Sequence, residues 1–237
     1  MNKAKTGRTG TIGDLRIAPR VVAGAIRNAF ADPHDLRDGL LRNVWIELKR
    51  FSAQNVRTVE LTRIRGIDRV NVEGPVSRHG ALIVSALATL LECERIFEFG
   101  GSDGETARLL ARNLPAAEIY SFEAGPTREG PFDLLPTLGT RIANLSGDAN
   151  TYDFLPYSGT IDLVHIDASQ RVDFLRADTD AAFGMLSELG SIVWYGYSFQ
   201  AAVYGFLNTL APTLDRPIFY LAGTRLAVYS RWDIISS

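Results

Sequence analysis

The chain has 237 residues, of which 46% are hydrophobic and 22% are charged. This is ordinary globular composition, and it excludes an intrinsically disordered chain. The formal net charge is −2, with 25 basic and 27 acidic residues, so the charge gives no indication of a nucleic-acid partner.

Cysteine content and hydropathy exclude further classes of protein. Cys93 is the single cysteine, which excludes an intramolecular disulfide framework and a metal cluster made of cysteines alone. No stretch approaches the roughly 18 apolar residues that a membrane-spanning helix needs. Lys3, Lys5 and Arg8 are not followed by an apolar run, so we expect no secretory signal. We therefore expect a cytoplasmic protein with no membrane partner.

Residues 1–75 are expected to form a helical extension whose first eight to ten residues are disordered. Helices are predicted over 17–30 and 35–52. In the second helix, apolar residues recur at intervals of three or four and form one stripe: Leu36, Leu40, Val44, Leu48 and Phe51. Such a stripe needs a partner, so these helices would cover a cleft or form a homodimer interface.

Residues 76–237 are predicted to form an α/β domain. Extended pieces at 56–64 and 70–72 precede a helix over 77–92. Apolar strands and helices then alternate, with strands at 95–99, 118–123, 141–145, 161–167 and 191–196, and helices at 104–113, 172–187 and 198–210. The last two strands, 217–221 and 225–230, are joined by a turn that only an antiparallel pair can use. We expect a mostly parallel, seven-stranded sheet with helices on both faces and a C-terminal hairpin.

A glycine turn separates the strand at 95–99 from the next helix. Such a turn lets a ligand approach the backbone closely at a helix N-terminus. The dinucleotide fingerprint GxGxxG fails here, because Ser102 and Glu105 stand at two of its glycine positions. The phosphate-loop pattern fails too. What remains is Glu98 followed by Gly100 and Gly104, and the structural alternative is a plain strand–helix turn.

This spacing resembles the first motif of the class I S-adenosylmethionine-dependent methyltransferases, which have a Rossmann-like fold. Three more carboxylates fall at the ends of predicted strands in the order that this family shows: Glu123, Asp148 and Asp167. Open α/β sheets bind ligands at this edge. The stretch from Gly147 to Ser198 is similar to a bacterial subgroup that typically reads D-G-x-H after the fourth strand and W-H-D-Y after the fifth. The resemblance covers about residues 75–230.

The resemblance implies S-adenosylmethionine as cofactor and a small-molecule methyl acceptor as partner. Glu98, Gly100, Gly101 and Ser102, with Gly104, would hold the methionyl end of the cofactor. Glu123 with Ala124 would bind the ribose, and Asp148 with Ala149 the adenine. Asp167 would lie where the cofactor meets the acceptor.

The chain departs from the subgroup at two positions. Gln170 stands in place of its histidine, and Gly196 in place of its aspartate. One carboxylate and an amide would be a poor site for Mg²⁺, so we predict no catalytic metal.

Three residues could act on the acceptor: Asp167, His165 and His79. His165 shares a face of its predicted strand with Asp167, although it could be a core histidine. His79 lies just after Ser77, at the start of the helix before the glycine turn, and its alternative is a surface or capping residue.

The function expected is methyl transfer to an oxygen or nitrogen atom of a small molecule. The lost histidine and aspartate motivate an alternative, a catalytically inactive methyltransferase fold that acts as a binding or scaffold protein. A nicotinamide-dependent oxidoreductase is disfavoured by the failed fingerprint and by the terminal hairpin.

Overall fold

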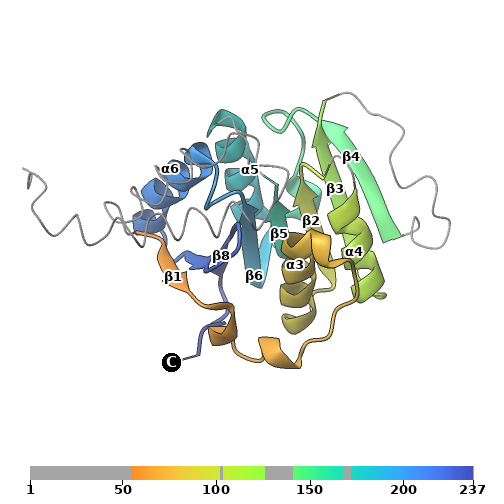
Figure 1. Cartoon of the computed structure of the whole chain (residues 1–237). Coiled ribbons are helices and arrows are strands. Elements are labelled where there is room, and N and C mark those ends of the chain that lie inside the picture. Colours follow the sequence, from red (N-terminus) through yellow and green to blue (C-terminus); the bar gives the residue numbers. More distant parts are fainter. Residues whose placement is uncertain (1–54, 102–103, 126–140, 168–171, 237) are drawn as a thin grey trace, which may run out of the picture.

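The computed structural model describes residues 55–101, 104–125, 141–167 and 172–236. Across these residues eight strands form one sheet in the order β1-β7-β8-β6-β5-β2-β3-β4 (Figure 1). The strands are β1 (Arg57–Val59), β2 (Arg95–Phe99), β3 (Glu118–Ala124), β4 (Ile142–Gly147), β5 (Ile161–Ile166), β6 (Leu186–Tyr195), β7 (Phe219–Leu221) and β8 (Leu226–Ser230).

The pairing confirms the expected fold class. Strands β4, β3, β2, β5 and β6 run parallel to one another, whereas β8 is antiparallel to both β6 and β7. Tyr195 at the end of β6 pairs with Leu226 at the start of β8, which places the C-terminal hairpin beside the parallel strands. The chain therefore has the Rossmann-like arrangement predicted from its alternating strands and helices.

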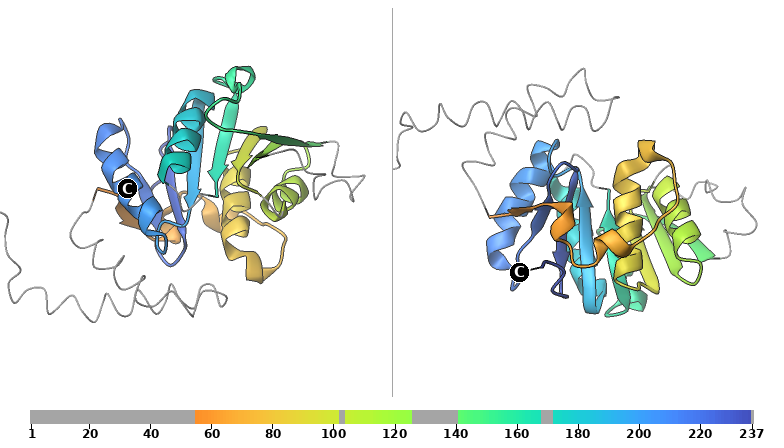
Figure 2. Two further views of the ribbon diagram at one scale, coloured as in Figure 1. Left: turned by 90° about the horizontal axis from the view of Figure 1, so that it is seen from above. Right: turned by 60° about the horizontal axis from the view of Figure 1, so that its bottom comes forward.

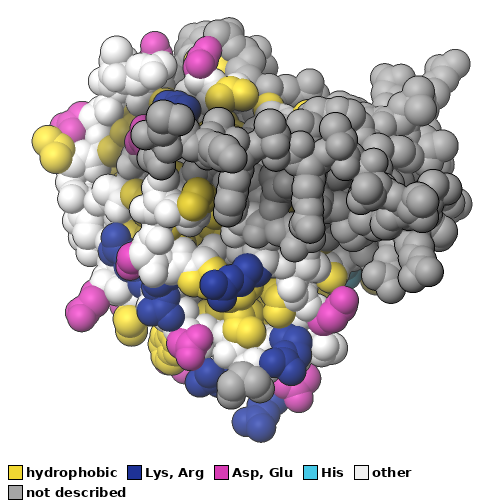
Figure 3. All heavy atoms as spheres, turned by 90° about the vertical axis from the view of Figure 1, so that its left-hand side faces the viewer, with side chains coloured by type: hydrophobic (Ala, Val, Ile, Leu, Met, Phe, Trp, Pro, Cys, Tyr) yellow, Lys and Arg dark blue, Asp and Glu magenta, His cyan; other side chains and the backbone are white. Residues whose placement is uncertain are grey.

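The eighth strand, β1, was not expected in the sheet. Thr58 pairs in parallel with Tyr220 of β7, and an isolated bridge joins Ile64 to Ile235. Figure 3 shows this side of the molecule, where basic and acidic side chains are interspersed on the described surface. Part of the predicted extension over 1–75 is thus a strand of the sheet itself. The extended piece predicted at 70–72 is not a strand.

Helices cover both faces of the sheet, as the two views of Figure 2 show. They are α3 (His79–Leu90), α4 (Glu105–Asn113), α5 (Val172–Met185) and α6 (Ala201–Leu210). Leu87 and Leu110, from α3 and α4, belong to one core, whereas Leu175 and Leu207, from α5 and α6, belong to the other. Successive residues of a strand point to opposite faces, so each central strand contributes to both cores.

A cluster of aromatic rings lies on the α5 side of strands β2 and β3. Phe122 lies in edge contact with Tyr152 and Phe154, with ring centroids 4.9 and 5.5 Å apart. Phe99 also meets Phe154, at 5.6 Å. Tyr152 and Phe154 come from the segment between β4 and β5, so that segment packs on β2 and β3, the strands on either side of the glycine turn.

The helices predicted at 17–30 and 35–52, and the homodimer interface assigned to them, lie outside the described residues. In the part of the chain that the structure describes, no helix combines the length and hydropathy needed to span a membrane.

Candidate functional site

The order in which the chain adds strands to the sheet reverses between β2 and β5. From β2 the chain moves outward through β3 and β4, and it returns to the other side of β2 with β5. Ligands of open α/β sheets bind outside the carboxyl ends of the strands at such a switch point. Gly100 follows β2 here, and Asp167 follows β5.

Gly100 and Asp167 are in close backbone contact. The Asp167 N–H donates to the oxygen of Phe99 at 2.9 Å. Gly100 has φ +87°, and a Cβ added to it would lie 2.6 Å from the Asp167 backbone oxygen. A side chain at position 100 is therefore excluded both by conformation and by space.

The glycine turn rests on a buried polar group. The Glu98 side chain is fully buried, with Oε1 3.1 Å from His165 Nδ1 and Oε2 accepting a hydrogen bond from Ser121 Oγ at 3.4 Å. A Cβ on Gly101 would overlap the Glu98 carboxylate. Glu98 thus lies inside the protein, directly beneath the turn.

This burial changes the interpretation of His165. The residue is only 4% exposed and its side chain faces Glu98, so it does not share the exposed position of Asp167. Strand β5 ends at Ile166, so Asp167 lies beyond the strand at the exposed edge of the sheet, whereas His165 lies within the buried strand. The geometry favours the core-histidine alternative for His165.

The turn leads into α4 with its own backbone constraint. Gly104 has φ +61° and donates from its N–H to the Gly101 oxygen at 2.7 Å. Ser102 lies outside the described residues. The compact turn leaves the first residues of α4 next to the switch point, where backbone N–H groups of a helix start are available to a ligand.

His79 lies at the same end of the molecule. It begins α3 and is exposed. The residue before it, Arg78, forms an ion pair with Glu105 in the first turn of α4. The residue after it, Gly80, lies against the Tyr195 ring at the end of β6, since an added Cβ would be 3.4 Å from that ring. These two contacts place His79 between the glycine turn and the end of β6.

The next two strands bring further carboxylates to this edge. Glu123 of β3 is level with Ser146 of β4, and the Gly125 N–H donates to the Gly147 oxygen at 3.0 Å. Glu123 is half-buried and Ala124 is exposed, and Asp148 and Ala149 directly follow β4.

Local hydrogen bonds favour the ionised form of Asp148. Its Oδ1 accepts from the backbone N–H and from the side-chain Nδ2 of Asn150, both at 2.9 Å. These two bonds, the backbone bond first, lower the pKa of Asp148 below its usual range.

An arginine that the sequence did not single out, Arg225, lies at the end of β6 beside Gly196. Gly196 has φ +96° and its N–H donates to the Arg225 oxygen at 2.9 Å. Arg225 is buried, donates to Tyr195 Oη at 3.1 Å and lies 4.2 Å from the ring centroid of Phe199. An arginine at the start of a predicted hairpin strand gives no sequence signal of this position.

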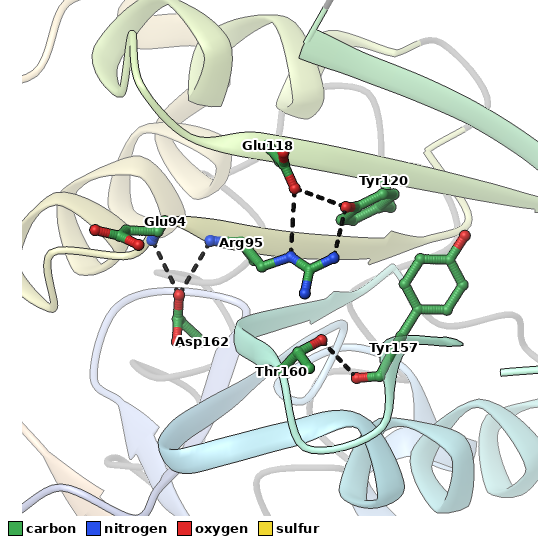
Figure 4. Close-up of polar contacts among 7 residues, drawn as sticks. All are labelled: Glu94, Arg95, Glu118, Tyr120, Tyr157, Thr160 and Asp162. Atoms are coloured by element: carbon green, nitrogen blue, oxygen red, sulfur yellow. Dashed lines mark hydrogen bonds and ion pairs between the residues drawn. The ribbon is translucent and has the colours of Figure 1, made fainter. Parts of the chain in front are cut away.

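Polar contacts at the opposite, amino edge of the sheet are structural (Figure 4). Asp162 Oδ2 accepts from the backbone N–H groups of Glu94 and Arg95 at 3.0 Å each. The Arg95 guanidinium bonds Tyr120 Oη at 2.9 Å and pairs with Glu118 at 3.3 Å. These contacts fix the starts of β2, β3 and β5, far along the strands from the switch point.

Metal ligands do not gather in the described residues, where no three His, Cys, Asp or Glu side chains come together as a metal-binding group. Gln170 lies outside the described residues, and the absence of a catalytic metal stays a prediction.

No protein-family model and no curated protein sequence matches the chain. Solved structures do match its fold. The SAH-bound methyltransferase PaMTH1 of Podospora anserina superposes with a TM-score of 0.54 at 18% identity, covering 78% of this chain and 94% of that one.

Two further solved structures have a similar fold. The O-methyltransferase TomG of Streptomyces achromogenes, solved in complex with SAM, has a TM-score of 0.51 at 18% identity. The match covers 79% of this chain and 94% of that one. Cofactor-bound Rv0187 from MTB has a TM-score of 0.51 at 20% identity, and the match covers 69% of this chain and 84% of that one. At these identities the likeness shows the fold alone, which this chain shares with the three structures.

Proposed function

We propose that this chain is an S-adenosylmethionine-dependent methyltransferase acting on an oxygen or nitrogen atom of a small molecule. The observation that carries the proposal is the contact of Gly100 with Asp167 at the switch point, where a side chain at position 100 is excluded. The structures that share this fold include proteins solved with SAM or SAH, which supports the same ligand here.

The residues present fit this cofactor. A turn without side chains at Gly100 and Gly101 allows close approach of a ligand to the backbone. A carboxylate-rich edge suits a ligand that carries a positive charge and ribose hydroxyls, and it would repel a pyrophosphate.

We assign the cofactor contacts by position along this edge. The turn residues Gly100, Gly101, Ser102 and Gly104 bind the methionyl end. Glu123 and Ala124 bind the ribose, and Asp148 and Ala149 the adenine. Glu98 acts from beneath the turn as a positioning residue, because its carboxylate is fully buried against His165.

Methyl transfer needs little chemistry from the protein. The cofactor supplies a methyl group on a sulfonium, which is already activated. The bound cofactor would supply its methyl group to the acceptor, so the residues of this chain would contribute mainly by aligning the acceptor. A hydroxyl acceptor also loses its proton, and Asp167 or His79 would take it. Both lie at the carboxyl edge, and both side chains are exposed.

Calorimetric titration of the purified chain with S-adenosylhomocysteine, and with NAD as the control ligand, tests the proposal. We expect micromolar binding of the former alone. Absence of binding to either would contradict the cofactor assignment and favour the alternative of a scaffold with this fold.

A further inference from the structure

The side chain of Gln200 fills the space above Gly196. Gln200 is the N-cap residue of α6, and its backbone N–H donates to the Gly196 oxygen at 2.8 Å. The side chain folds back over the glycine, so that a Cβ on Gly196 would lie 2.9 Å from Gln200 Cδ. Position 196 therefore carries no side chain, and a carboxamide from the next helix occupies its place.

Gln200 is buried without a partner for its oxygen. The residue is 8% exposed, and Oε1 is buried and accepts no hydrogen bond from the residues that the structure describes. Buried polar atoms are nearly always hydrogen-bonded, because an unpaired one destabilises the fold. An unpaired carboxamide oxygen of this kind is able to accept a hydrogen bond from a ligand.

A second buried amide on the same helix shows the ordinary arrangement. Asn208 Oδ1 accepts from the N–H groups of Asn55 and Val56 at 3.2 Å each. Its Nδ2 donates to Tyr197 Oη at 3.0 Å and to the Tyr204 oxygen at 2.9 Å. Asn208 thus serves the fold, and Gln200 differs from it in leaving its oxygen unpaired.

Gln200 lies at the edge of the sheet that carries the proposed site. Trp194 of β6 is paired with Ile166 of β5, so the chain just beyond β6 lies beside Asp167. The half-buried rings of Tyr195 and Phe199 are in contact here, with centroids 5.7 Å apart. The cofactor residues come from β2, β3 and β4, which leaves the β5–β6 side for the acceptor.

We infer that Gln200 Oε1 accepts a hydrogen bond from the methyl acceptor before transfer, through the hydroxyl or ring N–H group that is to be methylated. A carboxamide cannot take the proton, so the proton passes to Asp167 or His79 as the methyl group arrives. The inference rests on the proposed function and deepens it. The methylated product carries a methyl group in place of this hydrogen, so it loses the bond to Gln200. The residue therefore discriminates between acceptor and product and favours product release.

A matched pair of probes tests this inference: 4-fluorophenol, which has the donor, and 4-fluoroanisole, in which a methyl replaces it. Dissociation constants are measured by fluorine NMR on protein saturated with S-adenosylhomocysteine. The wild type is expected to bind the phenol about tenfold more tightly, as one hydrogen bond provides. Gln200→Met should bring the two constants together and leave the affinity for S-adenosylhomocysteine unchanged.

Thermal melting separates this role from a structural one. Gln200→Met should not lower the Tm of the ligand-free protein, since no hydrogen bond of the side chain is lost. Asn208→Leu, the matched control, should lower it. Equal binding of the two probes by the wild type, no binding of either, or a preference that survives Gln200→Met would overturn the inference. Loss of S-adenosylhomocysteine binding by the wild type would instead overturn the proposed function.

Discussion

The carboxylate of Glu98 lies directly beneath Gly101, where a single added methyl group would overlap it. The same carboxylate is held by His165 and Ser121. The shape of the glycine turn is therefore set by a polar group on the strand before it, and changes on either side of this contact should be coupled.

Gly101→Ala tests this coupling. The substitution should destabilise the protein by about 1–3 kcal/mol, because the new methyl group is forced against a fully buried side chain. In a Glu98→Ala background the same substitution should cost less, since the overlapping oxygen is gone. Urea unfolding of the four proteins gives the coupling free energy, and strictly additive effects would contradict the contact.

Gly100→Ala should be destabilising for a different reason. The positive φ and the backbone oxygen of Asp167 both oppose a side chain, and a backbone obstacle cannot rotate away. We expect a loss of about 1–3 kcal/mol together with weaker binding of S-adenosylhomocysteine.

Gly184→Ala is the matched control for that experiment. Gly184 lies in α5, where an added Cβ meets nothing within 4 Å. Alanine there should stabilise the helix by up to about 1 kcal/mol. If the two variants had equal free energies of unfolding, the constraint assigned to Gly100 would be wrong.

Glu123 and Glu118 provide a test within one strand, because they lie at opposite ends of β3. Glu123→Ala should weaken binding of S-adenosylhomocysteine by about 1–3 kcal/mol through the loss of charged hydrogen bonds. Glu118→Ala breaks an exposed pair with Arg95 and should leave this affinity unchanged. Calorimetry on both variants decides, and an unaltered affinity in Glu123→Ala removes that residue from the site.

The stability of the fold should depend on pH through Asp178. Burial raises the pKa of this carboxyl from 3.8 to about 6. A raised pKa means that the folded state binds the proton more tightly than the unfolded state does. Stability is therefore greatest below pH 4 for this group, and it falls as the pH rises through about 6.

Asp178→Asn should remove that dependence. The gain at pH 8 should be about 1–2 kcal/mol, less than the full shift implies, because part of the side chain reaches solvent. Unfolding free energies at pH 5 and pH 8 measure it. Asp180→Asn, at an exposed position of the same helix, should leave the slope unchanged, and a similar effect of both would contradict the assignment to Asp178.

Sequence patterns predicted the elements that position the site. Both ends of the strand at 95–99 were predicted correctly, because a short apolar run bounded by turn residues is typical of a buried strand. The order of strands then placed Gly100, Glu123, Asp148 and Asp167 at one edge without any knowledge of distances.

Features that depend on distant pairing were not predicted. Strand β6 begins at Leu186, earlier than expected, because it pairs with β5 across an irregularity near Ile161 and Leu163. The Gln200 carboxamide meets Gly196 only because α6 starts with a sharp return of the chain. No periodicity in one stretch of sequence carries such information.

The pairing of β1 with β7 has a consequence for the order in which the molecule is built. Residues 57–59 leave the ribosome some 160 residues before their partners at 219–221. Ile64 and its partner Ile235 are separated by a similar length of chain. The parallel strands from β2 to β6 can associate during synthesis, whereas this edge of the sheet closes only after the hairpin has emerged. A nascent chain stalled before β7 would already contain the strands that carry the proposed cofactor site. Its β1 would still be unpaired, so a chaperone or the hairpin of a second copy could bind to that strand.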